Sequence, residues 1–350
     1  MKMNILVLNT MGEEVFETFF PQDVQDKLAE VGEVHYVSAE PGEELSAELL
    51  KLVEETEILF TGWGVPRLNE DFYRCARRLK LIAHTGGSVG DLASPKLEQR
   101  GIFLLSGNRY YAESVAQATI CYMLLGQRRL YPILKKTEKD GWCSEVTTQG
   151  LRGKTVGLVS FGMIAKNVAR MLRAFDCRVK VCSSHKLADE ELQTYEIEQC
   201  SAEELFRTAD IVSVHSALTD KNYHEINAEK LSLMHDGALL VNTARGAVID
   251  EGALTKELCS GRLRAVLDVF EEEPLPMTSP LRGLDNVVIV PHMGGPTTDV
   301  RRLVTLGLID DVKRLAEGNL NLENQISMAY AKNMTSHAIT ERRKHEIQEG

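Results

Sequence analysis

The stretch "GLVSFGMIA" (residues 157–165) has residue types and spacing that could bind the pyrophosphate of a dinucleotide. It follows the G-x-G-x-x-G fingerprint, with Gly162 at the middle position and Ser160 and Ala165 at the outer two. The middle glycine lets backbone approach the anion, and the helix expected to follow would direct its N-terminal amides at it. Serine should strain the turn slightly, whereas alanine still permits close helix–strand packing. Because one fingerprint is a weak signal, a strand–helix junction that binds nothing remains the alternative.

Polar residues follow most of the strands predicted in this part of the chain. In an open parallel sheet, ligands collect beyond the carboxyl ends of the strands. The positions just after the predicted strands hold Ser160–Gly162, Ser183–His185, His215 and Ser216, Thr243–Gly246, Asp268 and His292. Loops are often polar for other reasons, so this pattern favours a nucleotide cleft only modestly.

The elements that must position these residues read as parallel α/β structure, because short β-rich runs alternate with helical stretches. Six strands, enough for a doubly wound dinucleotide-binding sheet, are expected at 154–159, 178–182, 210–215, 238–242, 264–270 and 286–292. An earlier series is expected at 4–8, 57–62, 79–84 and 101–105. Long helices are expected at about 112–130, ended by Pro132, and at about 297–317.

Composition favours a soluble protein that acts on small molecules. A chain of 350 residues predicts two domains, and a net charge of −11 would repel nucleic acid and anionic lipid surfaces. Seven cysteines without a C-x-x-C pair indicate a reducing compartment. The N-terminus lacks a signal-peptide pattern and no apolar run approaches membrane-spanning length. We therefore expect a cytoplasmic protein with no nucleic-acid or membrane partner.

Three further motifs stand in order after successive strands: "LLVNTARGAVIDEGAL" (239–254), "AVLDVFEEEPLP" (265–276) and "VPHMGGPT" (290–297). Together with "TVGLVSFGMIA" and "DIVSVHSALT" they resemble the D-isomer-specific 2-hydroxyacid dehydrogenase family, including its phosphoglycerate dehydrogenase-like members. The resemblance runs through residues 154–297 and extends more loosely over the rest of the chain. Three ordered motifs are far more specific than one glycine turn, so the resemblance favours a dinucleotide site at 157–165.

The resemblance implies a fold of two doubly wound parallel-sheet α/β domains, with a Rossmann dinucleotide-binding domain inserted into a smaller flavodoxin-like substrate domain. We expect the substrate domain at residues 1–107 and 298–334, the NAD(P)-binding domain at 108–297 and a charged tail at 335–350. A homodimer and the use of NAD or NADP are also implied. No metal site is expected.

The implied catalytic residues are Arg245, Glu273 and His292. A 2-oxo acid needs a cation that holds its carboxylate and polarises its ketone, and arginine does this with a two-pronged donor geometry. The carbonyl oxygen must receive a proton as hydride arrives on carbon, and histidine titrates nearest neutral pH. A carboxylate partner would fix the imidazole and favour its charged form. Glu273 is chosen from three adjacent acids because it directly precedes Pro274, as the acid of the family precedes its proline.

The implied cofactor contacts lie at the strand exits. They are Phe161, Gly162, Met163, Ile164, Ser183, Ser184, His215, Thr243, Ala244, Asp268 and Gly294, with Asp268 facing the nicotinamide carboxamide or serving only as a turn residue. An acid at the end of the second strand would select NAD. Ser183 stands there instead, within "VCSSHKL", so we expect NADPH to be used at least as well as NADH. The alternative is that this loop selects nothing and other contacts favour NADH.

The implied substrate contacts lie in the first domain. Gly86, Gly87 and Ser88 in "AHTGGSVG" offer backbone amides for the substrate carboxylate. Trp63 falls about where relatives that act on phosphorylated acids place an anion-binding arginine. We therefore expect no cation there and a substrate tail without charge, although Arg67 is near enough in sequence to supply one.

The predicted activity is hydride transfer between NAD(P)H and a small 2-oxo acid, which gives a D-2-hydroxy acid. A catalytically idle relative that binds dinucleotide as a sensor or interaction module is the alternative. The presence of the arginine, glutamate and histidine together favours the enzyme.

Overall fold

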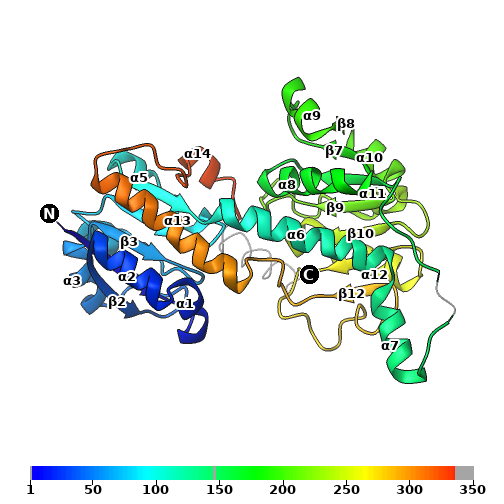
Figure 1. The fold of residues 1–350 in the computed structure, drawn as a ribbon, viewed down its shortest axis with the longest axis horizontal. Coiled ribbons are helices and arrows are strands. Elements are labelled where there is room, and N and C mark those ends of the chain that lie inside the picture. Colours follow the sequence, from blue (N-terminus) through cyan, green and yellow to red (C-terminus); the bar gives the residue numbers. More distant parts are fainter. Residues whose placement is uncertain (1, 145–146, 336–350) are drawn as a thin grey trace. The chain divides into compact units, whose positions relative to one another are not determined.

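The computed structural model describes residues 2–144 and 147–335, so the predicted charged tail lies outside the described residues except for Thr335. The chain divides into two compact units. Of the described residues, the first unit comprises those up to Tyr111 and those from Pro296 to Thr335, and the second runs from Ala112 to Gly295. Each unit contains one parallel sheet, as Figure 1 shows. The prediction of two parallel-sheet α/β domains is confirmed.

The sheet of the first unit has the order β2-β1-β3-β4-β5. Its strands are β1 (Met3–Asn9), β2 (Gly32–Ser38), β3 (Ile58–Thr61), β4 (Leu81–His84) and β5 (Phe103–Ser106). This is the flavodoxin-like order, in which all strands are parallel. The chain adds strands on one side of β1 and then on the other, so the switch point at which ligands bind in such sheets lies between β1 and β3. Every residue of β3 and β4 is buried, and all but the last of each, Thr61 and His84, are apolar, as expected for central parallel strands. β2 was not predicted; it is an edge strand in which only Gly32 is buried and the other residues are partly or fully exposed.

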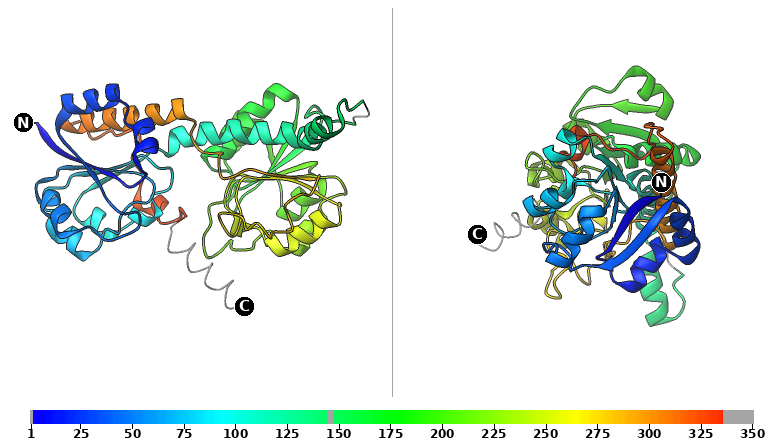
Figure 2. Two further views of the ribbon diagram at one scale, coloured as in Figure 1. Left: turned by 90° about the horizontal axis from the view of Figure 1, so that it is seen from below. Right: turned by 90° about the vertical axis from the view of Figure 1, so that its left-hand side faces the viewer.

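Helices cover both faces of this sheet. One face is packed by α1 (Glu13–Phe19), α2 (Gln22–Val31) and α13 (Thr298–Ala316), which lie side by side in Figures 1 and 2. The other face is covered by α3 (Ala47–Glu55), α4 (Glu70–Cys75), α5 (Pro95–Gln99) and α14 (Met328–Ala331), with the short 3₁₀ helix η1 (Gly90–Leu92). Because α13 packs beside α1 and α2, segments far apart in the sequence build this core. The predicted helix at 297–317 is confirmed as α13.

The sheet of the second unit has the order β12-β11-β10-β9-β6-β7-β8, and all its pairings are parallel. Its strands are β6 (Thr155–Val159), β7 (Arg178–Cys182), β8 (Ile197–Gln199), β9 (Ile211–Val214), β10 (Leu239–Asn242), β11 (Arg264–Leu267) and β12 (Val287–Ile289). The six strands predicted here are all present, and β8 was missed. The order reverses between β6 and β9, so the switch point of this sheet lies at the turn after β6.

The helices of the second unit pack on both faces of its sheet. α6 (Asn108–Gln127), which begins in the first unit, and α8 (Met163–Leu172) share one apolar core with the strands. The remaining elements are α7 (Leu130–Asp140), η2 (Arg173–Phe175), α9 (Asp189–Tyr195), α10 (Ala202–Thr208), α11 (Ala228–Leu233), η3 (Gly246–Val248) and α12 (Glu251–Cys259). No described helix is both long enough and apolar enough to span a membrane.

Pro132 does not end the long helix, so that prediction is wrong. α6 ends at Gln127, and Arg129 has a left-handed backbone with φ of 52°. Pro132 lies in the first turn of the next helix, α7. Proline is tolerated there because first-turn N–H groups have no partner within the helix.

Candidate functional site

His292 and Glu273 are in direct contact. Nδ1 of His292 lies 2.7 Å from Oε2 of Glu273, and the other carboxylate oxygen accepts the Phe270 N–H at 2.9 Å. Burial raises the pKa of Glu273, but the hydrogen bonds from His292 and Phe270 and the charges of His292 and Arg245 outweigh it, so the pKa lies below the usual value. The carboxylate is therefore ionised at neutral pH. Half of the His292 side chain remains exposed and can meet a ligand.

Arg245 lies close enough to Glu273 for the carboxylate to influence it. Burial lowers the pKa of Arg245 and the charge of Glu273 raises it, but arginine stays protonated in proteins either way. The loop that carries Arg245 is shaped by the buried side chain of Asn242. Its amide Nδ2 donates to the Arg245 carbonyl at 3.0 Å, and its Oδ1 accepts the Ala244 N–H at 3.0 Å.

Gly246 brings the arginine loop against the loop that carries Glu273. A Cβ atom at position 246 would lie 1.9 Å from the carbonyl carbon of Phe270 and 2.4 Å from the amide nitrogen of Glu271. Real Cβ atoms do not approach backbone so closely, so only glycine fits. This close approach sets the separation of Arg245 and Glu273.

The buried carboxylate of Asp268 holds the histidine loop. It accepts the N–H groups of Met293 and Gly294 at 2.8 and 2.9 Å, and the hydroxyl of Tyr122 at 3.2 Å. The His292 N–H donates to the Asp268 carbonyl at 2.9 Å. His292 itself has φ of 51°, a backbone conformation that persists only where the surroundings impose it. Both oxygens of Asp268 thus have protein partners, and its predicted contact with nicotinamide stays a prediction.

The fingerprint turn lies at the switch point of the second sheet. Ser160 has φ of 72°, which agrees with the expected strain, and its hydroxyl lies 2.8 Å from that of Ser216. Gly162 is the N-cap of α8, no side chain caps the helix, and a Cβ there would meet nothing within 4 Å. Met163 and Ile164 form the first turn, whereas the Phe161 ring packs into the core against Tyr195.

His215 leaves an unpartnered ring nitrogen at the same switch point. Its Nε2 lies 3.0 Å from the Ser213 hydroxyl, and its buried Nδ1 has no hydrogen-bond partner among the described residues. Burial lowers the pKa of His215 to about 3, so the ring is neutral at physiological pH. An uncapped helix N-terminus, open space before Gly162 and this nitrogen together fit a dinucleotide phosphate and its ribose.

The loop after β7 is shaped by Gln199, which sequence reasoning missed. Its amide accepts the Leu187 N–H at 2.9 Å and donates to the His185 carbonyl at 2.8 Å. Within the loop, the Ser183 hydroxyl lies 3.2 Å from Nδ1 of His185, and Ser184 is exposed. Gln199 belongs to β8, whose three residues are too few for a recognisable strand pattern.

Of the other predicted cofactor residues, Thr243 and Ala244 are buried in the arginine loop. The Thr243 hydroxyl lies 3.0 Å from that of Thr119. Gly294 packs against Asp268, because a Cβ there would lie 2.7 Å from Oδ2 of the carboxylate.

In the first unit, the glycine loop follows β4. The Ser106 hydroxyl, 2.7 Å from the Gly87 carbonyl and 3.2 Å from the Gly86 carbonyl, donates to this pair of oxygens. A Cβ at Gly86 would lie 2.3 Å from Nε2 of His84. The Ser88 hydroxyl donates to the Thr335 carbonyl at 2.5 Å, so it already has a protein partner.

A cation lies beside Trp63, so the expectation that none does is wrong. The guanidinium of Arg301 lies over the indole, 5.2 Å from its centroid, and also over the Phe19 ring at 5.6 Å. Nε of Arg301 donates to the Pro296 carbonyl and its Nη1 to the Thr18 hydroxyl, both at 3.2 Å, so these partners are neutral. Trp63 is 37% exposed and sits at the exit of β3, next to the switch point of the sheet. Sequence reasoning missed Arg301 because it comes from α13, far along the chain.

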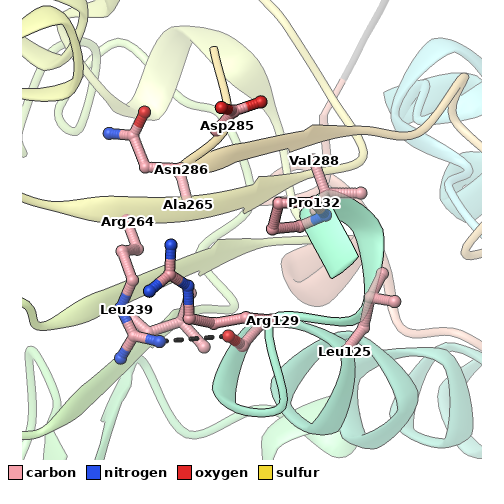
Figure 3. A pocket seen from close by; sticks show the side chains of 10 residues that line it. Leu125, Arg129, Pro132, Leu239, Arg264, Ala265, Asp285, Asn286 and Val288 are labelled. Carbon is pink, nitrogen blue, oxygen red and sulfur yellow. Dashed lines mark hydrogen bonds between the residues drawn. The ribbon is translucent and has the colours of Figure 1, made fainter. Parts of the chain in front are cut away.

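A small pocket of about 40 Å³ lies elsewhere in the second unit (Figure 3). Its lining includes Leu239 and Arg264, which begin β10 and β11, and Asn286, which precedes β12. The pocket therefore lies at the amino ends of these strands, at the opposite edge from His292, Glu273 and Arg245. Among the described residues, no group of histidine, cysteine and acidic side chains could hold a metal ion.

Comparison with known proteins points to one family. Residues 120–294 match the family described as D-isomer specific 2-hydroxyacid dehydrogenase, NAD binding domain. Hydroxypyruvate reductase of Thermotoga maritima is 32% identical, with 76% of this chain and 86% of that protein covered. Glyoxylate reductase of Thermofilum pendens is 33% identical, with 73% and 77% covered. The crystal structure of the TT0316 protein from Thermus thermophilus aligns with a TM-score of 0.74 and 31% identity, over 93% of this chain and 100% of that one.

The close approach at Gly246 gives a prediction that depends on packing alone. Gly246→Ala should lower the free energy of unfolding by about 1–3 kcal/mol, the cost of overpacking, because Phe270 and Glu271 must move. The matched control is Gly252→Ala in α12, where a Cβ would meet only a side-chain oxygen of Asp250 at 3.4 Å. Denaturant titration measures both, and equal stabilities would contradict the close approach.

Proposed function

Because the chain belongs to the D-isomer-specific 2-hydroxyacid dehydrogenase family and is an NAD(P)-dependent oxidoreductase, we propose that it reduces a small 2-oxo acid to the D-2-hydroxy acid with His292, Glu273 and Arg245 as its catalytic residues. The observation that supports this proposal most is the 2.7 Å contact between His292 and Glu273, which lies beside an arginine and leaves half of the histidine exposed. An idle dinucleotide-binding relative would have no use for this pair.

Each of the three residues has one task. Arg245 binds the substrate carboxylate and draws charge toward the carbonyl oxygen. His292, protonated, delivers its proton to that oxygen as negative charge develops on it. Glu273 accepts the hydrogen bond from Nδ1, which leaves the opposite ring nitrogen, Nε2, to face the substrate.

The nicotinamide cofactor would bind across the switch point of the second sheet and, when bound, supplies the hydride. Gly162 and the first turn of α8, with Met163 and Ile164, would bind its pyrophosphate. The loop of Ser183 and Ser184, with His185 and Lys186 beside them, would hold the adenosine ribose. Because this loop contains no acid to repel a 2′-phosphate, we propose that NADPH is used at least as well as NADH.

The first unit would bind the rest of the substrate. Gly86 and Gly87 would offer backbone amides to the carboxylate, and Ser88 would assist through its backbone. Trp63 and Arg301 would meet the substrate tail. The argument for an uncharged tail assumed that no cation lies near Trp63, and Arg301 removes that assumption.

We further propose a homodimer in the cytoplasm. The support for a second copy is a patch of exposed apolar side chains on α7, which buries none of its own residues, and just beyond it. These side chains are Leu130, Tyr131, Leu134 and Trp142, the last 88% exposed. Large exposed apolar patches mark interaction sites. The thiols of Cys75, Cys121, Cys177, Cys182, Cys200 and Cys259 are free, which is consistent with a reducing compartment.

The acid–base assignment predicts distinct effects of two substitutions. His292→Ala should lower turnover by about two to four decades, the range for loss of a general acid, while NADH affinity in a fluorescence titration stays near that of the wild type. Glu273→Gln should move the alkaline midpoint of the reduction profile to lower pH. The wild-type carboxylate, ionised at neutral pH, favours the protonated imidazole that reduction needs. The control is Glu272→Gln, an equal charge change in the same loop. Near-normal turnover by His292→Ala would end the assignment.

Cofactor choice is tested together with activity. Purified protein is mixed with NADH or NADPH and a panel that starts with hydroxypyruvate and glyoxylate, the substrates in the names of two relatives. We expect kcat/KM with NADPH to equal or exceed that with NADH, and Ser183→Asp to reverse the preference because a carboxylate repels the 2′-phosphate. A wild-type preference for NADH of about a hundredfold, or about 2.7 kcal/mol, would refute the cofactor proposal.

The role of Arg301 is tested with two substrates that differ in tail charge. Arg301→Gln should reduce kcat/KM for 3-phosphohydroxypyruvate about fivefold more than for hydroxypyruvate, equal to about 1 kcal/mol for a partly exposed charge pair. Arg302→Gln is the control, since Arg302 pairs with Asp23. Equal losses on both substrates would show that Arg301 does not meet the tail.

A further inference from the structure

Glu271 is joined to Glu251 by two reciprocal hydrogen bonds. The Glu251 N–H donates to Oε1 of Glu271 at 2.9 Å, and the Glu271 N–H donates to Oε2 of Glu251 at 2.9 Å. Glu251 is the first residue of α12. The arrangement therefore ties the acidic loop, defined here as residues 270–274, to the start of that helix.

His224 also lies next to the Glu271 carboxylate. Its Nε2 lies 2.6 Å from Oε1 of Glu271, whose side chain is only 13% exposed. The histidine is held in turn: its N–H donates to the Ala247 carbonyl at 2.9 Å, and its ring stacks on Tyr223 with centroids 3.9 Å apart. Its φ of 50° is a conformation that L residues rarely adopt. The Glu271 carboxylate is thus held by two separate segments of the chain.

The position of Glu271 bears directly on Glu273. The Phe270 N–H, one residue before Glu271, donates to Oε1 of Glu273, and Oε2 of the same carboxylate contacts His292. On the other side, Gly246 packs against the backbone of Phe270 and Glu271. A shift of Glu271 would therefore move the donor that orients Glu273 and the backbone that abuts the arginine loop.

We propose that Glu271, held by Glu251 and His224, is a positioning residue that fixes the acidic loop so that the Glu273 carboxylate meets His292. This inference rests on the proposed function. Glu271 itself does not touch substrate, because its carboxylate is enclosed and bonded within the protein. The acidic groups next to this carboxylate are Glu251, Glu272 and Glu273, and the titratable ring of His224 faces it from the other side. Burial, and after it the charges of Glu271, Glu272 and Glu273, raise the pKa of Glu251.

The test compares three single variants in steady-state kinetics. Glu271→Ala should lower kcat about tenfold, because a small displacement of a catalytic group is costly, and leave the affinity for NADH unchanged. Glu271→Gln keeps an oxygen that accepts the Glu251 N–H and lies beside Nε2 of His224, so it should rescue most of the activity. Glu272→Ala removes the same charge from an exposed neighbour and should behave as the wild type. If Glu271→Ala does not fold, His224→Ala, which keeps the bonds to Glu251, should still lower kcat.

A double-mutant cycle separates positioning from loss of stability. If Glu271 acts through Glu273, then Glu271→Ala combined with Glu273→Gln should be no slower than Glu273→Gln alone, within about twofold. The alkaline midpoint of the pH–rate profile of the double variant should also match that of Glu273→Gln. The proposal would be overturned if the kcat losses of the two single variants multiplied in the double variant. It would also be overturned if Glu271→Ala were as active as Glu272→Ala. A wrong assignment of the catalytic residues would give a different result. In that case His292→Ala and Glu273→Gln would themselves leave the activity intact.

Discussion

The carboxylate of Asp268 is the interaction on which the candidate site depends most. It is 1% exposed, and it accepts two successive backbone N–H groups just after His292. Hydrogen bonds to a charged acceptor are stronger than neutral ones, and a buried carboxylate without donors would be costly. Asp268 therefore both requires and enforces the conformation of residues 292–294. The left-handed backbone of His292 is a consequence of that constraint.

The other two loops are placed by strand order and by one close contact. β10, β11 and β12 are neighbours, so the loops that carry Arg245, Glu273 and His292 leave the same edge of the sheet in sequence. At that edge, the absence of a side chain at Gly246 lets the first two loops pack in direct backbone contact. Asn242 then fixes the shape of the arginine loop with its amide group. The site is thus built from backbone hydrogen bonds and van der Waals contact more than from ion pairs.

Local sequence patterns were sufficient for much of this architecture. The buried strands are apolar runs bounded by turn residues, and choosing Glu273 by its place before Pro274 selected the acid that contacts His292. The patterns failed where the signal is weak or long-range. β2 is a mostly exposed edge strand, β8 has three residues, and Pro132 fits a first helical turn as well as it ends a helix. The contact of Arg301 with Trp63 joins residues far apart in the chain, so no local spacing could reveal it.

The edge position of β12 has a consequence for local opening. This strand has three residues and pairs only with β11, so few ladder hydrogen bonds hold it. Segments with few such bonds are the first to open in native-state fluctuations and lose amide protection before the core does. The His292 segment is kept from this behaviour by the bonds to Asp268, which lies after β11, deeper in the sheet. The lifetime of the closed segment is therefore governed by a side chain on the adjacent strand exit rather than by the strand that precedes the histidine.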